Sequence, residues 1–211
     1  MVKIYIEGKE KRVPESDFLS SLLSHIGVPL DKYEIIHTGG FTNLLDSDSM
    51  PYVELLRANT DDGGINLVIF DADSEKNKGG YTVRSEYLLN KRDQLGLKFD
   101  LFLWPNNYED GDVEVLMESI ARKDLYPEFF DCFTKYEHCM SLRKNDKGEP
   151  FYSTPNRKGK LHTYFHALPI SNTKKNRFGQ GVWRWSDELI WDLDADSLNP
   201  IKGFLLKYLE K

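Results

Sequence analysis

The chain is poor in cysteine, because its 211 residues include only Cys132 and Cys139. Seven positions apart, these two would lie two helical turns apart on one face, which is too far for a disulfide. We therefore expect a fold without disulfides in a reducing compartment, the cytoplasm, with both thiols buried. A zinc site would need more ligands than the cysteines and the neighbouring His138 supply.

Long hydrophobic runs are also missing. The longest uninterrupted apolar stretches are far shorter than the roughly 20 residues that cross a bilayer. The N-terminal stretch MVKIYIEGKE contains no long apolar region, so we expect no signal peptide. The sequence thus predicts a protein that does not associate with membranes.

Positive charge is not in excess, since 28 lysines and arginines face 34 aspartates and glutamates, a net charge of −6. Such a surface does not attract nucleic acid as a whole. The charge is uneven, however: residues 157–177 contain six lysines and arginines and no acid, whereas acids concentrate at 109–118 and 187–196. A local basic face beside an acidic pocket is compatible with this distribution.

What the first half of the sequence does contain is an alternation of strand and helix patterns. Apolar and β-branched runs predict strands at 2–6, 33–37, 65–70 and 97–104. Apolar residues at helical spacing predict helices at 15–26, 48–58, 81–95 and 112–121. Short connections between them predict an α/β fold with a four-stranded, mainly parallel sheet flanked by helices.

The second half is mainly helical. Helices are predicted at 125–142, 157–167 and 197–209, and the aromatic segment 182–191 is either a short strand pair or irregular. We interpret residues 1–122 as the α/β core and 123–211 as a helical extension packed on it. Trp183, Trp185 and Trp191 fit core packing better than base stacking, given the area that each tryptophan buries.

Acidic side chains follow three of the predicted strands. Glu7 and Glu10 follow the first strand, Asp71 and Asp73 the third, and a group that includes Glu114 the fourth. Ligands of open α/β sheets bind outside the carboxyl ends of the strands, where these acids would meet. Clustered carboxylates repel one another unless protons or a cation compensate. Oxygen-only ligands suit Mg²⁺ or Mn²⁺.

The Asp71-Ala72-Asp73 pattern has two interpretations. In an extended segment, residues two apart share a face, so both carboxylates would point at one ion. Alternatively, Asp73 caps the next helix and Asp71 binds backbone amides, as aspartates often do. Because Glu7 follows a neighbouring strand, we favour the interpretation in which the two aspartates bind an ion.

The motifs IYIEGKE and IFDAD, at this spacing, resemble the TOPRIM domain, a Rossmann-like catalytic fold of topoisomerases, bacterial primases and OLD-type nucleases. Together with HTGG, GDVEVL and the late WDLD, they look like a small stand-alone TOPRIM-like family of bacterial proteins. The glycine-rich stretch of primases and topoisomerases is reduced here to Thr38-Gly39-Gly40, and no topoisomerase tyrosine can be assigned. The resemblance therefore supports cation binding better than any one reaction.

The resemblance implies metal-dependent phosphoryl transfer on DNA or RNA, as in a nuclease that hydrolyses phosphodiesters. The metal-binding acids it implies are Glu7, Glu10, Asp71, Asp73 and Glu114. Glu7 would be a ligand or general base, and Lys160, or Lys158 in a shifted register, would stabilise transition-state charge. Expected phosphate contacts are Gly39, Gly40, Lys78 and Arg84.

Other functions stay open. A non-catalytic TOPRIM-like module would bind a cation, nucleic acid or a protein partner, including a second copy of the chain. A receiver-type phosphoacceptor domain also has acids at its strand ends, but not a pair of aspartates after the third strand. A dinucleotide-binding protein would need GxGxxG after the first strand, which the sequence EGKEKR does not provide.

Overall fold

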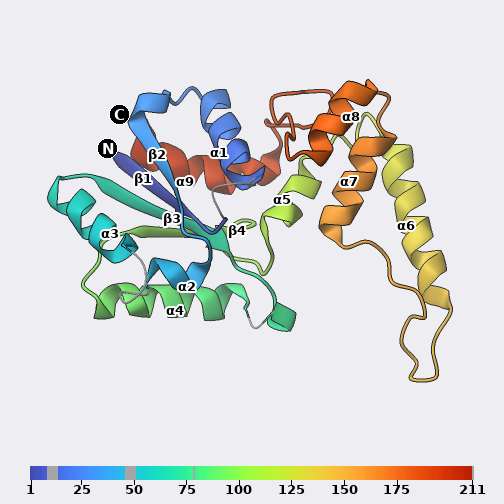
Figure 1. Cartoon of the computed structure of the whole chain (residues 1–211), viewed down its shortest axis with the longest axis horizontal. Helices are drawn as coiled ribbons and strands as arrows, with labels where there is room; N and C mark the ends of the chain where they lie inside the picture. The colour runs from blue at the N-terminus through green and yellow to red at the C-terminus, as the bar shows by residue number, and fades with distance from the viewer. Residues whose placement is uncertain (9–13, 46–50, 78, 211) are drawn as a thin grey trace. The chain divides into compact units, whose positions relative to one another are not determined.

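The computed structural model describes residues 1–8, 14–45, 51–77 and 79–210 (Figure 1). The chain forms two compact units. Residues 1–120 and 193–211 make up one, the sheet unit, and residues 121–192 the other, the helical unit. The sequence predicted a division into residues 1–122 and 123–211. In the structure the last 19 residues belong to the sheet unit instead.

Four parallel strands form the single sheet described in the sheet unit, in the order β2-β1-β3-β4. Their bounds are Val2–Ile6 for β1, Tyr33–His37 for β2, Ile65–Asp71 for β3 and Asp100–Trp104 for β4. The predicted α/β class and four-stranded parallel sheet are confirmed. The central strand β3 is buried on both faces, which explains its continuous apolar run.

Helices cover both faces of the sheet (Figure 1). On one face, Phe18 of α1 (Pro14–His25) contacts Trp104, and Phe204 of α9 (Asn199–Leu209) contacts Phe102. On the other, Val68 and other strand residues form a core with α2 (Phe41–Leu44), α3 (Tyr52–Asp61) and α4 (Tyr81–Gln94). The sheet unit also contains α5 (Val113–Ser119) and the 3₁₀ turns η1 (Leu30–Lys32), η2 (Glu75–Asn77) and η3 (Asp196–Leu198).

The strand order creates a switch point between β1 and β3. From β1 the chain continues to β2 on one side, whereas β3 leads to β4 on the other. Ile6 lies opposite Ile69, and Asp71 lies opposite Trp104, so the carboxyl ends of three strands meet at one edge. Ligands of open parallel sheets bind at such a point.

The helical unit is built on aromatic side chains carried by α6 (Pro127–Leu142), α7 (Arg157–Ala167), α8 (Asn172–Gly179) and the segment after it. Phe165 stacks on Phe178 with ring centroids 3.8 Å apart. The three tryptophans between 183 and 191 are at most 2% exposed, which confirms their predicted core role. The segment 182–191 is irregular, apart from one bridge between Ala121 and Trp191. Helix α8 was not predicted.

Both cysteines are exposed, so the prediction of buried thiols is wrong. They lie on α6, whose buried contact with the unit is made by Phe133. Phe129 and Phe133 occupy the buried face of α6, and Cys132 and Cys139 lie at other positions around the helix.

None of the helices in the described part of the chain is long and apolar enough to cross a membrane.

Candidate acidic site at the carboxyl edge of the sheet

Glu7 directly follows the last residue of β1, at the switch point of the sheet. The backbone amides of Asp71 and Phe41 favour the charged form of its carboxylate and so lower its pKa. Burial nevertheless raises the pKa of Glu7, the nearby Arg84 opposes this, and Asp73 adds to it. Its Oε2 atom is buried and has no hydrogen-bond partner among the described residues. A buried carboxylate oxygen without a partner is unfavourable unless a proton or a cation compensates.

Gly39 and Gly40 shape the loop that supports Glu7. Both have positive φ angles, 73° and 150°, which favour glycine. The Gly39 N–H donates to the Gly8 carbonyl at 3.3 Å, and the Thr38 hydroxyl lies 3.0 Å from the Ile6 carbonyl. The loop thereby ties β2 to the end of β1. The expected phosphate contact of the two glycines stays a prediction.

Asp71 is the last residue of β3. Its Oδ1 accepts a hydrogen bond from the Val113 N–H at 2.9 Å, so the alternative in which Asp71 binds a backbone amide is realised. Burial raises the pKa of Asp71 well above its usual value, and the carboxylates of Glu15, Glu7 and Glu114 raise it further. Asp71 thus belongs to a group of interacting acids.

Glu15 belongs to this group and was missed in the sequence. It lies in the first turn of α1, is 8% exposed, and its Oε1 accepts from the Trp104 indole N–H at 2.9 Å. Burial raises the pKa of Glu15 to about 8, with the carboxylates of Glu7 and Glu114 adding to the effect. An acid in the first turn of a helix is ordinarily exposed and interacts favourably with the helix dipole, so its position in the sequence did not indicate burial.

We call Glu7, Glu15, Asp71 and Glu114 the acid cluster. Each of the first three has a raised pKa, and each is raised in part by at least one other carboxylate. Glu114 lies in the first turn of α5, whose N-cap Asp112 accepts from the Val115 N–H. This arrangement favours the protonated form of these carboxyl groups, because their charged forms are buried and repel one another.

Asp73 does not continue the extended conformation of β3. Its φ of 61° ends the strand geometry, so the rule that residues two apart share a face no longer applies. Its carboxylate pairs with Arg84 of α4 instead. The expectation that both aspartates bind one cation stays a prediction.

Arg84 is 4% exposed, and its guanidinium carbon lies 3.5 Å from the centroid of the Phe41 ring. It is therefore a buried partner of Asp73, and its expected phosphate contact stays a prediction. Its Nη1 atom has no hydrogen-bond partner within the described part of the chain. Arg84 lowers the pKa of Glu7, so its positive charge acts on the acid cluster.

Across residues 1–8, 14–45, 51–77 and 79–210, no three side chains of histidine, cysteine, aspartate or glutamate are disposed to hold one metal ion. Mg²⁺, however, is commonly bound by one or two carboxylates together with waters and substrate phosphates. Glu7, with its unpartnered oxygen, and Asp71 are two carboxylates of this kind. Their binding of Mg²⁺ or Mn²⁺ stays a prediction.

Three further expected site residues are Glu10, Lys78 and Lys160. Glu10 and Lys78 are outside the described residues. Lys160 belongs to α7 of the helical unit, where its Nζ lies 5.4 Å from the centroid of Phe133. Its catalytic role, like that of Lys158, stays a prediction.

The loop after Asp73 folds back tightly on the site. The Gly80 N–H donates to the Ala72 carbonyl at 2.8 Å. A Cβ on Gly79 would lie 2.5 Å from the Asp73 Cβ and 2.8 Å from the Ala72 carbonyl oxygen. The loop therefore needs glycine at position 79 to hold Asp73 against Arg84.

Replacing Gly79 by alanine is expected to lower the free energy of unfolding by about 1–3 kcal/mol, because backbone must move to relieve the clash. Gly203→Ala is the matched control: nothing lies within 4 Å of the position that a Cβ would take there in α9, and alanine is expected to add about 0.5–1 kcal/mol. Urea unfolding of both variants checks the pair, and equal effects would contradict the proposed role of Gly79.

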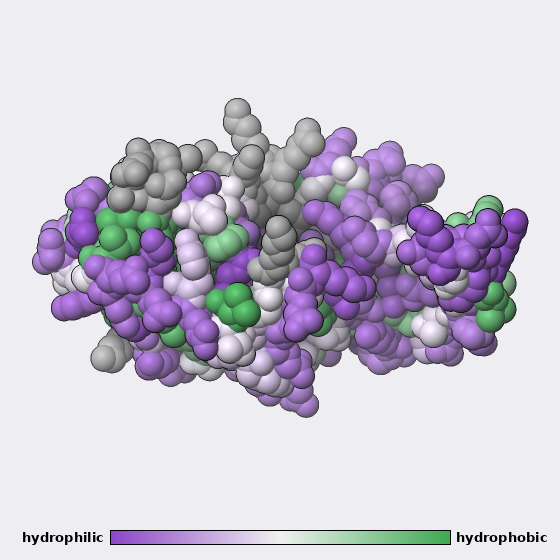
Figure 2. Space-filling model, turned by 90° about the horizontal axis from the view of Figure 1, so that it is seen from below, coloured by the Kyte–Doolittle hydropathy of each residue, from purple (hydrophilic) through white to green (hydrophobic). Residues whose placement is uncertain are grey.

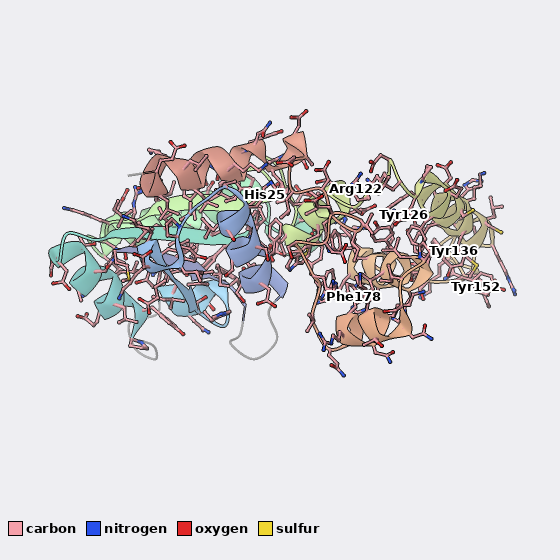
Figure 3. All side chains as sticks on the ribbon, turned by 90° about the horizontal axis from the view of Figure 1, so that it is seen from above. His25, Arg122, Tyr126, Tyr136, Tyr152 and Phe178 are labelled. Atoms are coloured by element: carbon pink, nitrogen blue, oxygen red, sulfur yellow. The ribbon has the colours of Figure 1, made fainter. Side chains whose placement is uncertain are left out.

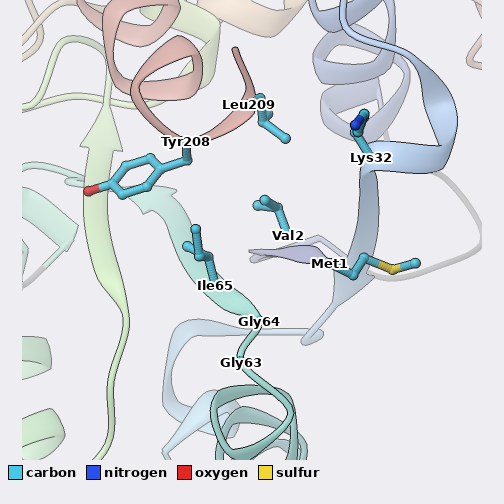
Figure 4. A pocket seen from close by; sticks show the side chains of 8 residues that line it. All are labelled: Met1, Val2, Lys32, Gly63, Gly64, Ile65, Tyr208 and Leu209. Atoms are coloured by element: carbon cyan, nitrogen blue, oxygen red, sulfur yellow. The ribbon is translucent and has the colours of Figure 1, made fainter. Parts of the chain in front are cut away.

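A separate hollow of about 190 Å³ lies at the opposite, amino-terminal edge of the sheet (Figure 4). Its lining combines glycines and apolar residues, such as Ile65 and Leu209, with Lys32 and Tyr208. No carboxylate is among the described residues that line it, and none of its lining residues belongs to the acid cluster.

Comparison with protein-family models, with curated proteins and with solved structures finds no match, and the likeness to TOPRIM rests on the motifs of this chain.

Proposed function

We propose that the chain is a TOPRIM-like, divalent-cation-dependent phosphoryl-transfer protein that hydrolyses phosphodiester bonds in nucleic acid. The observation that carries the proposal is the buried, unpartnered Oε2 of Glu7 beside Asp71 at the switch point of the sheet. Two coupled carboxylates with a free oxygen are a site that gains from a cation. The TOPRIM resemblance supplies the reaction class.

In this proposal, Glu7 and Asp71 hold Mg²⁺ or Mn²⁺ at the strand ends. The bound ion would lower the pKa of a water and neutralise charge on a phosphoryl group. Glu15, held by the Trp104 indole, supplies a buried carboxyl whose pKa of about 8 lets it gain or lose a proton near neutrality. The Asp73–Arg84 pair fixes the loop beside the site.

The direct test is cleavage of a supercoiled plasmid and of end-labelled single-stranded DNA and RNA by the purified chain. We expect products with Mn²⁺ or Mg²⁺ and none when EDTA replaces the metal, because the carboxylates alone cannot neutralise the phosphate. Calcium serves as a control that binds oxygen ligands and supports such reactions poorly. Cleavage that persists in EDTA would contradict the proposal.

A second candidate function is a TOPRIM-like module that binds a cation without catalysis. The Asp73–Arg84 pair favours it, because it occupies the second aspartate that the resemblance assigns to the metal. In that case Mn²⁺ would raise the melting temperature of the chain while no nucleic acid is cleaved under any of the conditions above. Thermal unfolding measured beside the cleavage assay separates the two functions.

A further inference from the structure

The two units carry opposite net charge. The helical unit, residues 121–192, contains 13 lysines and arginines and 9 acids, a net charge of +4, and the rest of the chain contains 15 and 25, a net charge of −10. Residues 150–186 include seven basic side chains and no aspartate or glutamate. The negative charge of the whole chain therefore conceals a basic unit, which suits a polyanionic partner.

An exposed cluster of one arginine and two aromatic rings lies in this unit. The Arg143 guanidinium carbon is 3.8 Å from the Phe151 centroid and 5.6 Å from the Tyr152 centroid. Arg143 Nη1 also donates to the Tyr152 hydroxyl at 3.1 Å. Yet Phe151 and Tyr152 remain 51% and 41% exposed. We call Arg143, Phe151 and Tyr152 the ring cluster.

The backbone fixes the ring cluster at the base of a short hairpin. The Phe151 N–H donates to the Arg143 carbonyl at 2.8 Å, and Lys144 bridges to Pro150. Asn145 closes the hairpin through the Glu149 carboxylate and the Glu149 N–H. The rings are therefore presented in a defined position rather than left on a free tail.

The surface around the rings is polar. Figure 2 shows hydrophilic side chains over most of the drawn surface of the helical unit, with small apolar patches. Tyr136 of α6, labelled with Tyr152 in Figure 3, is a further exposed aromatic residue, at 41%. Lys144 and Lys147 of the hairpin are also exposed. The hairpin also carries the exposed acids Asp146 and Glu149, so the rings lie among charged side chains of both signs. Such a surface differs from the broad apolar face of a protein interface.

We propose that the helical unit binds single-stranded nucleic acid, with bases stacking on the ring cluster and phosphates contacting the basic side chains. Aromatic rings accept any base because every base has a π face, and arginine adds cation–π attraction. Single strands fit better than a duplex, because the bases of a duplex are already stacked on one another. The inference deepens the proposed function, on which it rests, by naming its substrate class.

The test is fluorescence anisotropy of labelled oligothymidylate and oligouridylate with the full chain in EDTA, where no cleavage occurs. We expect tighter binding of single strands than of a duplex of equal length, weakening with salt. The variant F151A/Y152A is expected to bind about tenfold more weakly. Tyr108→Ala, which removes an exposed tyrosine of the sheet unit, is the matched control and should bind like the wild type. Circular dichroism verifies folding.

Three results would overturn the inference. The first is no measurable binding of either oligonucleotide, and the second is unchanged binding in F151A/Y152A. The third is self-association or binding of an acidic protein that depends on the rings while oligonucleotides do not bind. Failure of this inference and failure of the proposed function give different results. If the wild type binds oligonucleotides but does not cleave nucleic acid with metal, only the proposed reaction is refuted. If it cleaves nucleic acid but the rings do not contribute to binding, only the proposed binding surface is refuted, and Asp71→Asn, which leaves that surface intact, should still bind.

Discussion

Asp71→Asn is expected to lower Mn²⁺-dependent phosphodiester cleavage at least about 100-fold. Metal-assisted charge stabilisation amounts to several kcal/mol, and each 1.4 kcal/mol or so changes a rate about tenfold. Asparagine keeps the shape of the side chain and an oxygen that accepts from the Val113 N–H, so the strand end stays in place. What is removed is the charge that faces Glu7 and Glu15.

The measurement is the initial rate of plasmid nicking at saturating Mn²⁺, with urea unfolding alongside. Because the substitution removes repulsion between buried carboxylates, the variant should be at least as stable as the wild type in metal-free buffer. Asp62→Asn, at the exposed C-cap of α3, is the matched control and should leave the rate unchanged. An Asp71→Asn rate within about threefold of the wild type would remove Asp71 from the reaction, since that ratio corresponds to less than about 1 kcal/mol.

The second large effect that we expect is a dependence of the free energy of unfolding on pH, caused by Glu15. Its pKa of about 8 in the folded chain exceeds the ordinary value of 4.5, so the folded state binds the proton more tightly than the unfolded state. The stabilisation is fully present below the ordinary pKa and is lost as the pH rises through the folded one. At about 1.4 kcal/mol per pKa unit, the loss between pH 4.5 and about 8 is roughly 4 kcal/mol for an isolated group.

Glu15→Gln is expected to abolish most of this loss, because glutamine stays neutral and still offers an oxygen to the Trp104 indole. At alkaline pH in EDTA the variant should be the more stable protein. Asp17→Asn, an exposed acid on the same helix, is the control and should keep the wild-type profile. Urea unfolding across this pH range measures the difference, and parallel profiles for wild type and Glu15→Gln would show that Glu15 is not a neutral buried acid.

Local sequence patterns were sufficient for the sheet. The first two strands have the predicted bounds, because short apolar runs between turn residues leave little choice. The fourth strand is shorter than predicted: Leu97 and Phe99 are buried but precede the hydrogen-bonded segment Asp100–Trp104. An apolar run reports burial, and it does not report which of its residues pair with a neighbouring strand.

The site was less predictable because it depends on contacts distant in sequence. Glu15 becomes buried through Trp104, which lies 89 positions away. Asp73 turns toward Arg84 because of a positive φ that no spacing rule anticipates. Glu7 and Asp71 were accessible to sequence reasoning, since strand ends of a parallel sheet converge whatever the detail.

The bridge between Ala121 and Trp191 brings the entry and exit of the helical unit together, and the Arg122 N–H reinforces it through the Ile190 carbonyl. A segment whose two ends lie close together can be inserted into another domain, or replaced, without changing the fold of that domain. Insertions, deletions or replacements within residues 121–192 are therefore compatible with an unchanged sheet unit.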